Sequence, residues 1–230
     1  MLVTSQGMLR QVPLLLVNVE TEEGVTGRTW LFCYMRSVAP TIMSILGDVK
    51  TVAKGAPVDP AAAWAKLTRR VALIGLQGIA RMALAVFDTA CWDALARAAK
   101  QPLVPFLGAE LRRITAYNSC GLGLIDDLGA LAAEAEKLLA IGNFRAVKLR
   151  LDHPTLEFDI EAVKAGRKRV GGKVKLMVDY GQALAVDGAL ARGCALDKED
   201  IFWLEEPIRH DDYAGAPLLA RELKTPGQVG

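Results

Sequence analysis

Alternating apolar and polar positions predict a β-hairpin near the start of the chain. Residues 12–19 are rich in Val and Leu, residues 21–24 supply turn residues, and a second apolar run reaches Tyr34. Helices are expected to follow, one after Ser37 and another after residues 59–60. The first part of the chain is therefore expected to mix antiparallel strands with helices.

The clearest helix is expected at about residues 77–100. Its apolar positions recur at the spacing of one helix face, and Pro102 with Gly108 marks its end. A domain boundary is therefore expected near Gly108. The apolar positions are Ile79, Met82, Ala83, Val86, Ala90, Ala94 and Ala98.

Beyond Gly108, short apolar runs alternate with helical segments, which indicates parallel strands joined by helices. The pattern predicts four strands, and a fifth would begin at residues 225–226 after a helix that follows Asp212. The expected strands are residues 114–119, 146–151, 174–179 and 201–205, and the expected helices are residues 126–140, a segment after Pro154 and residues 183–194.

The composition indicates a globular protein whose partner is a small molecule. A chain of 230 residues with 52% hydrophobic residues can bury a sizeable core. The formal net charge of +2 gives no electrostatic case for binding nucleic acid or an anionic membrane. No apolar run approaches the roughly 18 residues that span a bilayer. The four cysteines form no CxxC pair, so we expect a cytoplasmic protein without a disulfide framework.

Charged residues end three consecutive predicted strands. Lys148 and Arg150 alternate with apolar residues and so share one face of their strand, the next strand ends in Asp179, and the third ends in Glu205 and Glu206. One such residue alone is more often structural, whereas three strands in succession favour a site, because β/α barrels collect their chemistry at this rim. Carboxylates on adjacent strands suit Mg²⁺. The strand period does not decide between the two glutamates.

The two histidines, His153 and His210, follow strands and are far apart in the sequence. A zinc site is therefore not expected, and both are interpreted as solvated loop residues.

Several longer motifs resemble one family when taken in order. The run of residues 82–95, followed by Gln-Pro-Leu at residues 101–103, is similar to the helix that joins the two domains of mandelate racemase-like proteins. Lys-Leu-Arg at residues 148–150, Met-Val-Asp-Tyr at residues 177–180 and Trp-Leu-Glu-Glu-Pro at residues 203–207 match later landmarks. The chain thus resembles the mandelate racemase/muconate lactonizing enzyme family of the enolase superfamily.

The resemblance implies an α+β capping domain at residues 1–108, followed at residues 109–230 by a partial (β/α) TIM-type barrel with about four strands. It also implies a Mg²⁺-dependent step in which the proton α to a carboxylate is removed through an enediolate. The expected activity is racemisation or dehydration of a hydroxy acid or acid sugar. A homo-oligomer is expected as well.

By the same resemblance, Asp179 and Glu205 are the expected metal ligands, and Lys148 and Arg150 the expected catalytic groups, with Lys148 neutralising the substrate carboxylate. Ser119 matches a hydroxyl that contacts substrate. The capping positions that close over substrate are Phe32, Tyr34 and residues 4–8.

The sequence also departs from the family. Arg150 stands where most relatives have the catalytic lysine, and a guanidinium is a poor base because it stays protonated. It could instead clamp a carboxylate, leaving proton transfer to Lys148 or to a group outside this chain. Gly181 replaces an asparagine of mandelate racemase. The third acidic ligand of relatives would follow Gly230, so the alternative is a truncated, non-catalytic fragment or pseudoenzyme that binds Mg²⁺ weakly.

Overall fold

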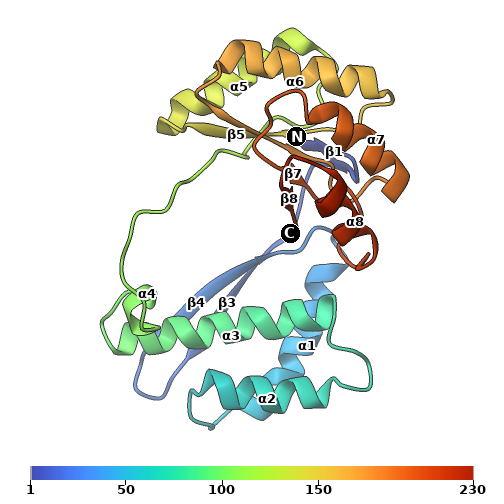
Figure 1. The fold of residues 1–230 in the computed structure, drawn as a ribbon. Coiled ribbons are helices and arrows are strands. Elements are labelled where there is room, and N and C mark those ends of the chain that lie inside the picture. Colours follow the sequence, from blue (N-terminus) through green and yellow to red (C-terminus); the bar gives the residue numbers. More distant parts are fainter. Residues whose placement is uncertain (1, 230) are drawn as a thin grey trace. The chain divides into compact units, whose positions relative to one another are not determined.

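The computed structural model describes residues 2–229, and for residues 2–4 and 9 it describes the backbone alone. The chain forms two compact units (Figure 1). One is Gln11–Arg113, and the other combines Met1–Arg10 with Ile114–Gly230. The sequence led us to expect one domain boundary, near Gly108. In the structure residues 1–10 belong to the same unit as residues 114–230, so the chain crosses between the two units twice.

The unit Gln11–Arg113 is a β-hairpin covered by helices, as the sequence predicts. Strand β3 (Leu14–Glu20) pairs antiparallel with β4 (Thr26–Phe32), and the long helix α3 (Ile79–Ala98) packs against this hairpin. The approach is close, since a Cβ atom at Gly27 would lie 1.9 Å from the carbonyl oxygen of Ala90. The other helices are α1 (Val38–Ala53), α2 (Pro60–Arg70) and α4 (Leu103–Phe106).

The second unit contains a parallel sheet with the strand order β5-β6-β7-β8. Its strands are β5 (Ala146–Arg150), β6 (Lys175–Asp179), β7 (Leu204–Glu205) and β8 (Gly227–Gln228). Helix α5 (Leu128–Gly142) precedes β5, and the helices between the strands are α6 (Leu156–Val170), α7 (Val186–Leu196) and α8 (Gly215–Glu222).

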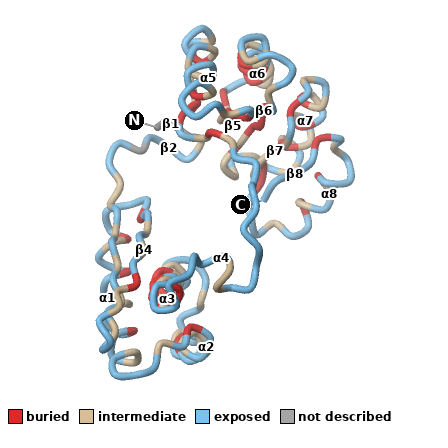
Figure 2. Tube along the Cα trace, turned by 90° about the vertical axis from the view of Figure 1, so that its left-hand side faces the viewer, coloured by how far each residue is buried: buried red, intermediate tan, exposed pale blue. Residues whose placement is uncertain are grey.

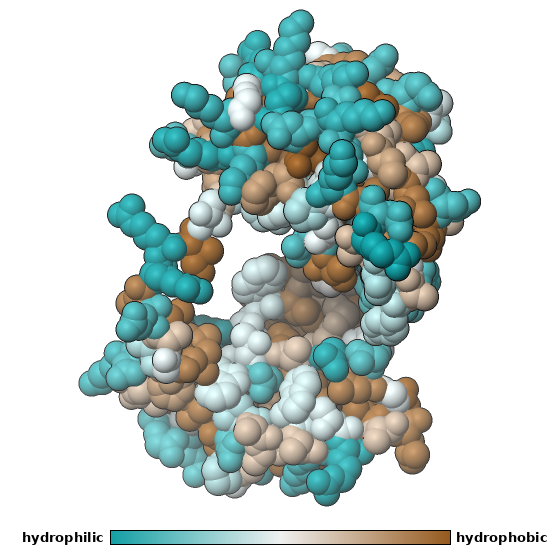
Figure 3. Space-filling model, viewed as in Figure 1, coloured by the Kyte–Doolittle hydropathy of each residue, from teal (hydrophilic) through white to brown (hydrophobic). Residues whose placement is uncertain are grey.

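Side chains of alternate strand residues bury one face of this sheet under the helices. Val147 and Leu149 of β5, with Leu151 directly after it, join Val178 and Leu204 in one apolar core. Buried residues follow β5, β6 and, in the other unit, α3 (Figure 2). Mostly hydrophilic residues cover the outside of α5 and α6 (Figure 3). The opposite faces of β5, β6 and β7 are thus left for polar side chains.

One local prediction is wrong, and another is correct only in part. Residues 114–119 do not form a strand: Asn118 makes an isolated bridge to Val147, and Ile114 is 80% exposed. No neighbouring strand pairs with the residues before Asn118, so apolar residues such as Ile114 are not buried by a sheet. The strand expected at residues 201–205 is confined to Leu204–Glu205, and it pairs on one side with β6 and on the other with β8.

The sequence reading also missed a short hairpin at the N-terminus. Strand β1 (Leu2–Thr4) pairs antiparallel with β2 (Gly7–Leu9). Within the part of the chain that the structure describes, no helix is both long and apolar enough to cross a membrane.

Candidate active site

The sheet register places four polar residues in one row across the carboxyl ends of the strands. Arg150 of β5 pairs with Asp179 of β6, Asp179 with Glu205 of β7, and Glu205 with Gln228 of β8. Because alternate strand residues point to the same face, the side chains of this row share the face opposite the apolar core. The row is the rim at which a β/α barrel gathers its active-site groups.

Lys148 joins the two carboxylates of this row. Its Nζ lies 2.9 Å from Asp179 Oδ2 and 2.5 Å from Glu205 Oε1. Lys148 is 6% exposed, so the ammonium is largely withdrawn from water. Burial alone would lower the pKa of Lys148, but hydrogen bonds and charge from Glu205 and Asp179 outweigh it and raise the pKa. The lysine is therefore held as a cation.

Backbone and ring donors orient both carboxylates. The backbone N–H of Gly181 donates to Asp179 Oδ1 at 2.8 Å, and Trp203 Nε1 donates to Glu205 Oε2 at 3.1 Å. Each carboxylate thus has one oxygen tied to an N–H group and its other oxygen on Lys148. Glu206 is held elsewhere, because its Oε1 accepts a hydrogen bond from Gln182 Nε2 at 3.2 Å.

Arg150 does not pair with its neighbour Asp179 in the described contacts. Its Nη1 donates instead to the carbonyl oxygen of Gly121 at 2.8 Å, and its backbone N–H donates to Leu122 O at 2.9 Å. These bonds fix the arginine to the loop that follows the Asn118 bridge. Ser119 is half-buried and lies two residues before Gly121 in the same loop. The roles of Arg150 and Ser119 stay predictions.

Phe32 and Tyr34 belong to the other unit, so their place at substrate also stays a prediction. Both side chains are partly exposed, and their rings meet edge to face with centroids 4.9 Å apart.

The tip of the hairpin β1–β2 is bound to the end of β6. Ser5 Oγ donates to the carbonyl oxygen of Tyr180 at 2.8 Å, and Gln6 Nε2 donates to that of Gly181 at 2.7 Å. Gly181 has a φ of +53°, and a Cβ there would lie 2.7 Å from Ser5 Oγ. The glycine is therefore suited both to its backbone conformation and to the close approach of the hairpin. Of the residues expected to close over substrate, Ser5 and Gln6 thus contact the two residues that directly follow Asp179.

A buried cluster behind the rim escaped the sequence reading. Asp159 of α6 is completely buried and accepts hydrogen bonds from His153 Nδ1 and from the Tyr180 hydroxyl, both at 2.8 Å. Arg192 of α7 forms an ion pair with the same carboxylate, and the backbone N–H groups of Asp152 and His153 donate to it. His153 is 3% exposed, so the expectation that it is solvated is wrong. His210 is exposed, as predicted.

This cluster ties the ends of two strands together. Burial alone would raise the pKa of Asp159, but hydrogen bonds from His153 and Tyr180 and the charge of Arg192 outweigh it and lower the pKa. Burial and the neighbouring carboxylate raise the pKa of Tyr180 far above its ordinary value. In the sequence, Asp159 and Arg192 are ordinary charged residues of helical segments, so no local pattern indicated that they pair.

The donor set fits a hard divalent cation, though incompletely. Asp179 and Glu205 supply two carboxylates on adjacent strands, and the ammonium of Lys148 shows that a positive charge is accommodated between them. Within residues 2–229, no three His, Cys, Asp or Glu side chains converge in a way that could hold a metal ion. The two carboxylates would leave such an ion mostly bound to water.

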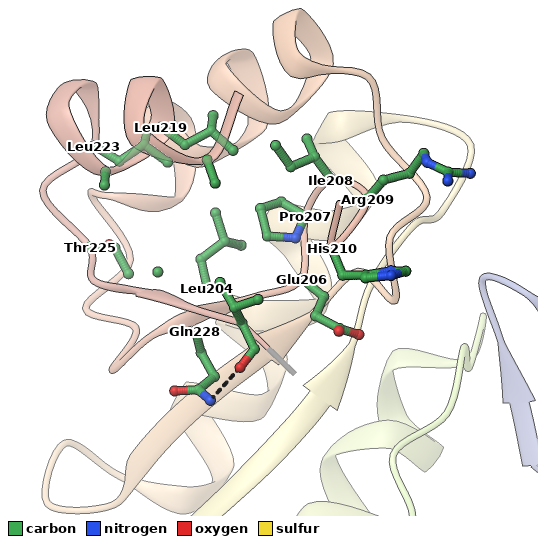
Figure 4. Close-up of a pocket in the computed structure, with 14 residues that line it drawn as sticks. Leu204, Glu206, Pro207, Ile208, Arg209, His210, Leu219, Leu223, Thr225 and Gln228 are labelled. Carbon is green, nitrogen blue, oxygen red and sulfur yellow. Dashed lines mark hydrogen bonds between the residues drawn. The ribbon is translucent and has the colours of Figure 1, made fainter. Parts of the chain in front are cut away.

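A separate apolar pocket lies on the other face of β7, under α8 (Figure 4). Leu204, Ile208, Leu219 and Leu223 point into it. Because Leu204 and Glu205 point to opposite faces, this pocket does not contain the carboxylates of Asp179 and Glu205, although Gln228 of the row also lines it.

Comparison with protein families agrees with this geometry. The model of the mandelate racemase/muconate lactonizing enzyme N-terminal domain matches residues 2–108, and the enolase C-terminal domain-like model matches residues 130–229. The chain belongs to the mandelate racemase-like family of the enolase superfamily. Its half-barrel and its N-terminal unit of strands and helices are the expected parts of that fold.

Individual relatives extend beyond this chain. A 3,6-anhydro-α-L-galactonate cycloisomerase of Streptomyces coelicolor is 29% identical over 95% of this chain and 60% of its own length. An arabinonate dehydratase of Saccharolobus solfataricus is 34% identical over 71% of this chain and 44% of its own. A crystal structure of an enolase from alpha proteobacterium BAL199 with bound Mg matches with a TM-score of 0.95 and 35% identity, covering all of this chain and 64% of that one. This chain therefore spans less than two thirds of the length of each.

Proposed function

We propose that the protein binds Mg²⁺ through Asp179 and Glu205 and removes the proton α to the carboxylate of a sugar acid. The observation that carries the proposal is the buried cation position between these two carboxylates, where Lys148 Nζ lies 2.9 Å and 2.5 Å from their oxygens. Two relatives that act on sugar acids and a structural neighbour with bound Mg support the substrate class and the ion. The activity is proposed for the whole protein, since the chain spans only part of its relatives' length.

In this proposal the carboxylates of the rim bind the metal ion, and the two cationic side chains act on the substrate. When bound, Mg²⁺ would supply positive charge that stabilises the enediolate oxygens as the α-proton leaves. Lys148 binds the substrate carboxylate, and Arg150 adds a fixed positive charge beside it. Arg150 does not accept the proton, because a guanidinium stays protonated at any working pH.

The position of Arg150 favours dehydration over racemisation. Racemisation needs proton transfer on both faces of the α-carbon, whereas dehydration needs one base for the α-proton and an acid for the leaving hydroxyl. With arginine at the position where relatives carry a lysine base, one face lacks its base. We therefore propose an acid-sugar dehydratase, and the base is supplied by a group other than Arg150.

The test is proton exchange together with product formation. The protein is incubated in D₂O with Mg²⁺ and a panel of aldonic and aldaric acids, and NMR follows deuterium at the α-carbon and loss of the β-hydroxyl. We expect a 2-keto-3-deoxy product from at least one sugar acid. The double variant Asp179→Asn, Glu205→Gln is the matched control and should be inactive.

A non-catalytic role is the second candidate. It is favoured by the lack, within residues 2–229, of a third side chain that could complete the metal site. Binding of Mg²⁺ without exchange or turnover on any acid of the panel would support it. A cytoplasmic location and a homo-oligomeric state stay predictions.

A further inference from the structure

Three charged groups share one buried position at the rim. The side chains of Lys148, Asp179 and Glu205 are 8%, 13% and 14% exposed, and the ammonium contacts both carboxylates. Two carboxylates held this close together repel each other unless a cation lies between them. The ammonium of Lys148 lies between them and supplies that positive charge.

The oxygens that Lys148 contacts are the ones that a shared metal ion would use. Asp179 Oδ1 and Glu205 Oε2 accept hydrogen bonds from the Gly181 N–H and from Trp203 Nε1. The remaining oxygens, Asp179 Oδ2 and Glu205 Oε1, are those on Lys148 Nζ. A Mg²⁺ ion needs its ligand oxygens at about 2.0–2.1 Å, so it cannot share this position with an ammonium group.

We infer that Lys148 is a displaceable internal counter-ion, whose ammonium group holds the position between Asp179 and Glu205 until Mg²⁺ replaces it. The inference rests on the proposed metal site, and it adds the order in which metal ion and substrate bind. Metal binding breaks both ion pairs of Lys148 and frees its ammonium at the same rim. The freed ammonium group of Lys148 then binds the substrate carboxylate, so the metal ion binds before the substrate.

The sign of one substitution tests the displacement. Lys148→Met keeps a long side chain but removes the competing charge and leaves the two carboxylates unneutralised. We expect its Kd for Mg²⁺ to fall at least about tenfold relative to the wild type, which corresponds to about 1.4 kcal/mol. Titration calorimetry with MgCl₂, supported by Mn²⁺ binding followed by electron paramagnetic resonance, measures this on the full chain. A lysine that only stabilises the fold would weaken binding or leave it unchanged when removed. A lysine that stays in place and repels the ion would also tighten binding when removed, so a shift of the Lys148 ¹³C resonance with Mg²⁺ is needed to show displacement.

Lys164→Met is the matched control. The side chain of Lys164 is 61% exposed and lies 3.5 Å from Glu199 on the outside of the helices, so its loss removes the same formal charge away from the rim. Its Mg²⁺ affinity should equal that of the wild type within about twofold, because exposed charges are screened by salt.

A second measurement covers the case in which Lys148→Met does not fold. In the wild type labelled at lysine ¹³Cε, saturating Mg²⁺ should shift the Lys148 resonance, which Lys148→Arg assigns by its disappearance. A Lys148 resonance that stays fixed at saturating Mg²⁺ would overturn the inference. So would a folded Lys148→Met protein that binds Mg²⁺ no more tightly than the wild type.

These outcomes separate the inference from the proposed function. If the wild type binds Mg²⁺ and Lys148→Met binds no more tightly, only the displacement is refuted and the metal site stands. If neither protein binds Mg²⁺ or Mn²⁺ at millimolar concentration, the metal site itself is refuted and the inference falls with it.

Discussion

The buried carboxylate of Asp159 allows a quantitative prediction about stability. Asp159→Ala removes the acceptor of the His153 ring, the Tyr180 hydroxyl and the Arg192 guanidinium. The Arg192 side chain is only 15% exposed, so it would keep a charge that water solvates poorly. Breaking a buried ion pair by removing one partner costs about 3–5 kcal/mol. We expect the free energy of unfolding of this unit to fall by that amount at pH 7.

Urea unfolding read by hydrogen exchange on peptides from α6 and β6 measures this loss in the correct unit. The control is Asp126→Ala, which removes an exposed aspartate of the same unit and should change stability by less than about 0.5 kcal/mol. If Asp159→Ala costs less than about 1 kcal/mol, then Arg192 and Tyr180 find other partners, and the assignment of the cluster as a buried anchor is refuted.

The pH dependence of the same variant has a defined sign. Because the pKa of Asp159 is lowered in the folded protein, its contribution is fully present above the unfolded value of about 3.9 and is lost as the pH falls through the folded pKa. Asp159→Asn does not carry this ionisation. The stability difference between the wild type and Asp159→Asn should therefore stay constant from pH 7 to about pH 4 and shrink as the pH falls further towards the folded pKa. A difference that also stays constant below about pH 4 would show that folding does not lower the pKa of Asp159.

Two further predictions concern the rim. Gly181→Ala places a Cβ 2.7 Å from Ser5 Oγ at a φ of +53°, so we expect faster hydrogen exchange in residues 2–9, and Ser5→Ala should have a smaller effect in the same direction. Unchanged exchange in Gly181→Ala would mean that the hairpin is not held there. In the intact protein, Arg150→Lys should keep dehydration within roughly tenfold, because both cations stabilise the developing charge, whereas Arg150→Met should be much slower. Equal rates for Arg150→Met and the wild type, measured by steady-state kinetics, would remove Arg150 from the chemistry.

The sequence alone determined the features that depend on local periodicity. The alternation of polar and apolar residues around Lys148 and Arg150 indicated a strand with cations on one face, and the structure has β5 there. The β/α order was readable in the same way, because each strand and helix carries its own period. Residues 114–119 show where local patterns fail. Their composition is typical of a strand, but only Asn118 pairs with a neighbouring strand.

Only the tertiary structure decided which side chains meet. The ion pairs of Lys148 depend on the register of β5, β6 and β7, and residues 148 and 205 lie 57 positions apart in the sequence. The burial of Asp159 likewise depends on two helices and two strand ends that converge from separate segments. Long-range register and convergence follow from packing the whole sheet and its helices, and a local pattern carries no information about a partner so far along the chain.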